Sequence, residues 1–109
     1  NITNVEFISG KFDDVLPSVL DATNGPYLLY VDGNHTFDAT MEYFKMALLN
    51  KNEYSAIIFD DIYWSEGMTK AWNQIKKNPE VTMSIDAFYF GIVFFRTSIK
   101  EKKDLRLFI

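Results

Sequence analysis

The sequence predicts an α/β domain with parallel strands and helices, followed by a C-terminal antiparallel strand pair. Short β-rich runs alternate along the chain with segments of helical periodicity. Residues 27–31 and 54–61 are apolar on both faces, which is typical of central parallel strands. Residues 81–86 and 88–96 are too close in the sequence for a crossover connection, so we expect them to pair antiparallel.

The first elements are short. Residues 4–9 predict a strand that ends at a glycine, and residues 12–22 place apolar side chains at helical spacing. Asp13 lies where a helix favours an acid, at its first turn. The turn formed by residues 24–26 then leads into the strand at 27–31.

Two further helices follow the two central strands. Residues 36–50 carry an apolar stripe with helical spacing, formed by Phe37, Met41, Phe44 and Leu48. The next helix begins at Ser65, which we expect to be its N-cap, and Lys76 and Lys77 suit its last turn. After Arg96 the sequence predicts only a mostly charged tail that ends in three apolar residues.

The composition excludes several classes of protein. A chain of 109 residues is long enough for one domain. Its net charge is −4, and it has no basic cluster suited to nucleic acid, since the run at 99–103 is interrupted by Glu101. No apolar run approaches the roughly 20 residues of a membrane helix. The absence of cysteine excludes disulfides and thiolate catalysis, and agrees with the reducing cytoplasmic location that we expect.

Acids follow both central strands. Asp32 comes after the first, and Asp60 and Asp61 end the second. Because ligands bind outside the carboxyl ends of parallel strands, these carboxylates are expected to converge on a hard cation such as Mg²⁺. His35, the only histidine, lies one loop away and could act as a general base.

Each of these features also has a structural interpretation. Asp32-Gly33 is a common turn dipeptide, and Asp60-Asp61 could simply begin a turn. A single histidine is more often a surface or capping residue than a catalyst. The coincidence of all three features at one sheet edge favours a site.

The sequences "VDGNHTFDATMEYFKMALL", "IIFDDIYWSEGMTKAWNQIKKNPEVTMSID" and "FGIVFFR" resemble the C-terminal half of class I S-adenosylmethionine-dependent methyltransferases. The most similar members have an Asp-Gly-x-His turn after the fourth strand. The resemblance runs from Gly10 to Arg96, and its most specific parts are residues 32–35 and 59–64.

The resemblance implies metal-assisted O-methylation of a small-molecule acceptor. In such enzymes, acids after the fourth and fifth strands hold Mg²⁺, and these correspond here to Asp32, Asp60 and Asp61. The histidine of the turn, here His35, corresponds to the base that takes the acceptor proton, and Asp32 shares the catalytic role.

The same resemblance implies that most of the cofactor side is missing. The chain has no glycine-rich turn, and residues 4–9 correspond to the third family strand. Gly10, Lys11 and Phe12 would then lie near the adenine of S-adenosylmethionine. We therefore expect residues 1–109 to be a single domain, the C-terminal half of the fold, that is inactive and binds the cofactor poorly by itself.

Absence of the first two family strands has a structural consequence. They would separate residues 4–9 from residues 27–31, so both segments would have bare edges. We expect residues 4–9 to collapse beside residues 27–31 or to pair with another copy, giving a homodimer.

Two other functions remain open. The chain could be a non-catalytic interaction or dimerisation module derived from this fold. It could also be a metal-dependent phospho-acceptor or phosphohydrolase, although receiver-type domains place the acid pair before the single acid. The acceptor substrate is not readable from the sequence.

Overall fold

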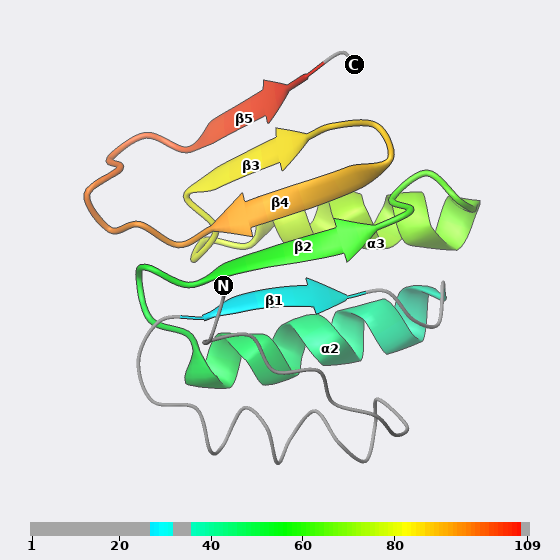
Figure 1. Ribbon diagram of the computed structural model, residues 1–109, viewed down its shortest axis with the longest axis horizontal. Coiled ribbons are helices and arrows are strands. Elements are labelled where there is room, and N and C mark those ends of the chain that lie inside the picture. The colour runs from blue at the N-terminus through cyan, green and yellow to red at the C-terminus, as the bar shows by residue number, and fades with distance from the viewer. Residues whose placement is uncertain (1–26, 32–35, 108–109) are drawn as a thin grey trace, which may run out of the picture.

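The computed structural model describes residues 27–31 and 36–107, and within them it shows one mixed sheet with two helices (Figure 1). The α/β class predicted from the sequence is confirmed. The elements are β1 (Leu28–Val31), α2 (Phe37–Asn50), β2 (Ala56–Asp60), α3 (Glu66–Lys77), β3 (Met83–Asp86), β4 (Phe90–Phe94) and β5 (Lys103–Arg106). The segments predicted at 4–9 and 12–22 lie outside the described residues.

The strand order is β1-β2-β4-β3-β5. β1 and β2 pair in parallel and β3 and β4 pair antiparallel, so both predicted pairings are confirmed. β4 lies between β2 and β3 and is antiparallel to each of them. The other four strands therefore run in one direction, and their carboxyl ends meet at one edge of the sheet (Figure 1).

The charged tail contains a strand that the sequence did not predict. β5 pairs in parallel with β3, and Ser84 Oγ donates a 2.5 Å hydrogen bond to Asp104 Oδ1 between the two strands. All four residues of β5 are exposed, so no alternation of apolar and polar residues marks it. Its charged side chains are typical of an edge strand that resists further pairing.

The helix boundaries follow from their caps. Thr36 Oγ1 accepts a hydrogen bond from Ala39 N at 3.3 Å at the start of α2. Ser65 Oγ accepts one from Met68 N at 3.2 Å at the start of α3, so the predicted N-cap is confirmed. Among the described residues, no helix is long and apolar enough to cross a membrane.

The core lies between the sheet and both helices. Phe59 on β2 contacts Phe44 of α2 and Trp72 of α3, with ring centroids 6.2 and 6.4 Å away. Both helices therefore cover the same face of the sheet. The Trp72 ring lies directly on Gly91 of β4, where a side chain would overlap it. Other fully buried core residues are Ile57, Ile62, Ile75, Val81, Val93 and Phe95.

The prediction that residues 27–31 are buried on both faces is wrong for β1. Val31 is buried and Leu29 packs against the core, but Leu28 and Tyr30 are 67% and 51% exposed. These two residues alternate with the core positions, so they occupy the face opposite the helices. The described helices cover one face of β1 only.

Candidate functional site

The acid pair lies at the carboxyl edge of the sheet. Asp60 is the last residue of β2 and pairs with Phe90 of β4. It is partly buried, and its carboxylate makes no hydrogen bond or ion pair with any other residue in the described ranges. Such a carboxylate has its oxygens available for a ligand.

Asp61 turns the chain out of the sheet. Its φ angle is 55°, a left-handed conformation that aspartate adopts more readily than most residues. Its N–H donates to Tyr89 O at 2.7 Å, and its carbonyl accepts from Trp64 N at 3.0 Å. These bonds fix where the loop from β2 to α3 leaves the sheet.

The other predicted site residues lie outside the described ranges: Asp32, His35, Gly10, Lys11 and Phe12. Val31 pairs with Phe59, and in the sequence Asp32 follows Val31 as Asp60 follows Phe59. No group of three His, Cys, Asp or Glu residues able to hold a metal occurs in the described part of the chain. Of the three predicted metal ligands, the structure describes Asp60 and Asp61, whose oxygens suit a hard cation, and the three-acid cluster stays a prediction.

A third acid lies at the same edge, and sequence reasoning missed it. Asp86 ends β3, and its side chain is only 6% exposed. Its Oδ2 accepts a hydrogen bond from the Tyr63 hydroxyl and lies 3.7 Å from Arg106 Nη2. Its Oδ1 accepts from Phe88 N at 2.9 Å. The sequence signal that could have identified Asp86 is its position at the end of the strand predicted at residues 81–86.

The surroundings of Asp86 affect two aromatic residues. Burial, and then the hydrogen bond and the charge of Asp86, raise the pKa of Tyr63, so the hydroxyl stays protonated and continues to donate. Phe88 has a φ angle of 71°, which is unusual for a bulky residue, and its N–H is held by Asp86.

These residues form a pocket of about 370 Å³. Tyr63, Asp86, Phe88, Arg106 and Leu107 line it, at the carboxyl ends of β3 and β5. The rings of Tyr63 and Phe88 are 5.8 Å apart between centroids. A pocket of this size lies within the range of small-molecule sites.

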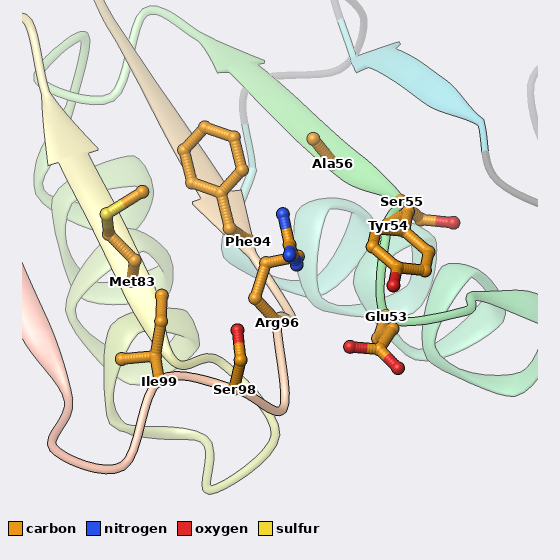
Figure 2. Close-up of a pocket in the computed structure, with 9 residues that line it drawn as sticks. All are labelled: Glu53, Tyr54, Ser55, Ala56, Met83, Phe94, Arg96, Ser98 and Ile99. Carbon is orange, nitrogen blue, oxygen red and sulfur yellow. The ribbon is translucent and has the colours of Figure 1, made fainter.

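A second pocket, of about 400 Å³, lies at the opposite edge of the sheet (Figure 2). It is formed at the start of β2 and β3 and at the end of β4, where the Arg96 guanidinium lies 4.6 Å from the centre of the Tyr54 ring. Its lining residues are Glu53, Tyr54, Ser55, Ala56, Met83, Phe94, Arg96, Ser98 and Ile99. It lies at the edge opposite Asp60 and Asp61, so it does not belong to the candidate site.

The comparison with protein families gives a match over the first part of the chain. A family model described as a methyltransferase domain matches residues 2–62, more than half of the chain. The chain belongs to this methyltransferase-domain family. Searches of curated proteins and of solved structures find no match.

The methyltransferase match covers only part of the chain. It includes every predicted site residue, from Gly10 to Asp61, and ends at Ile62. Tyr63, Asp86 and Arg106 follow the matched segment. The methyltransferase-domain similarity therefore covers the acid pair and leaves the Asp86 pocket outside it.

Proposed function

We propose that the full-length protein transfers a methyl group from S-adenosylmethionine to an oxygen of a small molecule, and that this chain contributes the acceptor side of the site. The observation that carries the proposal is the Asp60-Asp61 pair. It lies at the carboxyl end of β2, beside the parallel strand β1, and within the segment that matches a methyltransferase domain.

The acids and the histidine have separate roles in this proposal. Asp32, Asp60 and Asp61 would hold Mg²⁺ through their oxygens, and Asp60 has no competing partner in the described structure. The metal, when bound, favours the deprotonated form of the acceptor hydroxyl. His35 takes the hydroxyl proton, a role that suits a side chain titrating near neutral pH.

The cofactor side is only partly present. Gly10, Lys11 and Phe12 are proposed to contact the adenine of S-adenosylmethionine, which supplies an electrophilic methyl group when bound. Most of the cofactor site is proposed to come from strands that precede this chain. Positioning of the acceptor oxygen is then the main contribution of residues 27–107.

Methyl transfer by the full-length protein tests the metal and the base together. The assay follows labelled methyl from S-adenosylmethionine into a panel of small hydroxyl compounds, with and without a chelator and with His35→Ala. We expect a large loss of turnover in each case. Undiminished turnover in both would remove the metal and base assignments.

One observation favours a second candidate, a dimerisation module derived from the fold. β1 is the outer strand of the described sheet, and no described strand pairs with its free edge. An unpaired edge favours pairing with another copy. Recovery of the preceding sequence separates the two candidates, because a strand with a glycine-rich turn supports the enzyme and a stop codon supports the module.

A further inference from the structure

The Asp86 pocket is close to the acid pair. Asp60 pairs with Phe90, and the next residue of β4, Gly91, pairs with Asp86. Since neighbouring strands are about 4.8 Å apart, two strand spacings place the two acids on the order of 10 Å from each other along the sheet edge. Phe90 and Gly91 are consecutive, so Asp86 lies on the face of the sheet that the helices cover and Asp60 on the opposite face.

Asp86 already has its partners. Its two oxygens accept from the Tyr63 hydroxyl and from Phe88 N, and Arg106 lies beside Oδ2. The carboxylate is also almost fully buried. A cationic ligand would have to displace Arg106 and penetrate the pocket wall, so Asp86 is better suited to hold Arg106 than to bind a ligand.

Arg106 has hydrogen-bonding capacity beyond its contacts with Asp86 and Tyr63. Its side chain is 62% exposed, and its only ion pair among the described residues is the 3.7 Å contact with Asp86. A guanidinium has five N–H donors in a planar fork that matches a carboxylate. Asp86 restrains this fork at one end, which reduces the entropy lost when an anion binds.

Apolar surface adjoins the guanidinium. Phe88 is 58% exposed and Leu107 is 51% exposed, although both line the pocket. The Phe88 ring is supported by Tyr63 and Tyr89, with centroid distances of 5.8 and 5.0 Å. Its positive φ costs free energy, and such conformations are concentrated at ligand-binding sites.

We propose that this pocket binds a carboxylate carried on a flat apolar body, with Arg106 pairing with the carboxylate and Phe88 packing against the body.

Direct binding to the full-length protein tests the pocket without methyl transfer. The probes are naphthalene carboxylate, its neutral amide and the corresponding naphthylmethyl amine, titrated by calorimetry and by NMR. We expect the carboxylate to bind most tightly and to shift the Arg106 Nε–H and Phe88 N–H resonances. Arg106→Gln should weaken its binding by about ten-fold or more, as expected for loss of a charge-assisted hydrogen bond.

Lys103→Gln is the matched control, because it removes the same charge from an exposed position of the same strand. It should change the affinity by less than about two-fold. Tighter binding of the amine or the amide, equal losses in both variants, or unshifted Arg106 and Phe88 resonances would overturn the proposal. Carboxylate binding without methyl transfer to any acceptor would instead contradict the proposed function alone.

Discussion

The hydroxyl of Tyr63 donates a hydrogen bond to the buried carboxylate of Asp86, and it thereby ties the loop after β2 to the end of β3. This loop begins with Asp61, so the same contact joins the acid pair to the Asp86 pocket. The two residues are separated by 23 positions in the sequence, and β4 lies between β2 and β3 in the sheet.

Removal of this tether should destabilise the fold. Tyr63→Phe deprives Asp86 of one of its donors, and a buried carboxylate that loses a donor is costly. We expect the free energy of unfolding to fall by about 1–2 kcal/mol, measured by urea denaturation. Tyr89→Phe is the control, because Tyr89 is exposed and its hydroxyl makes no hydrogen bond to another described residue. Equal losses in the two variants would show that the contact with Asp86 contributes nothing.

Gly91 should not accept a side chain. A Cβ there would overlap the Trp72 ring, which lies on the strand and is fully buried, so we expect Gly91→Ala to cost about 3 kcal/mol. Gly67→Ala is the control, since the nearest atom to its added Cβ is Phe37 N at 3.5 Å. In α3 that change should be neutral or stabilise by up to about 1 kcal/mol.

A double variant identifies the cause. If the overlap with the ring is responsible, Gly91→Ala and Trp72→Leu combined should cost less than the sum of the single changes. Strict additivity in denaturation experiments would mean that the ring is not what excludes the side chain.

Tyr27 should make stability depend on pH in the alkaline range. Its hydroxyl donates to Ala47 O at 2.7 Å, and burial raises its pKa to about 12. In the unfolded chain a tyrosine titrates near pH 10, so the unfolded state releases its proton first. The contribution of Tyr27 is therefore complete below about pH 10 and declines as the pH rises toward 12.

Tyr27→Phe tests this dependence. The variant should be less stable at neutral pH, because Ala47 O loses its donor, and its stability should fall less steeply above about pH 10. Denaturation at a series of pH values gives the two slopes. A variant as steep as the natural protein would show that Tyr27 is not the group responsible.

Local sequence patterns account for much of the fold. The Ser65 cap, the basic last turn of α3 and the antiparallel hairpin follow from short-range signals. The parallel pairing of β1 with β2 is confirmed, although burial of β1 on both faces, from which it was predicted, is wrong. β5 does not follow from short-range signals, because its four residues are exposed and have no apolar periodicity. It is a strand because its backbone pairs with β3, which no local signal reports.

Local patterns likewise predict some residues of the candidate site and not others. Asp60 and Asp61 were found because acids at the end of a buried strand are a local pattern. The contacts of Asp86 with Tyr63 and Arg106 depend on strand order and on β5, so no local pattern predicts them. Asp86 itself could have been recognised as another acid ending a strand.

The most direct test of the account is methyl transfer by the full-length protein carrying Asp60→Ala. Asp60 has no partner among the described residues, so its removal should leave the fold intact. Glu66→Ala is the matched control, because Glu66 is an exposed acid in the first turn of α3, close to the same edge.

The measurement is kcat/KM for methyl transfer from labelled S-adenosylmethionine, with folding checked by circular dichroism. We predict that Asp60→Ala lowers kcat/KM by about 100-fold or more, while Glu66→Ala changes it by less than about three-fold. A folded Asp60→Ala protein with the activity of the natural one would contradict the placement of the reaction at this edge of the sheet.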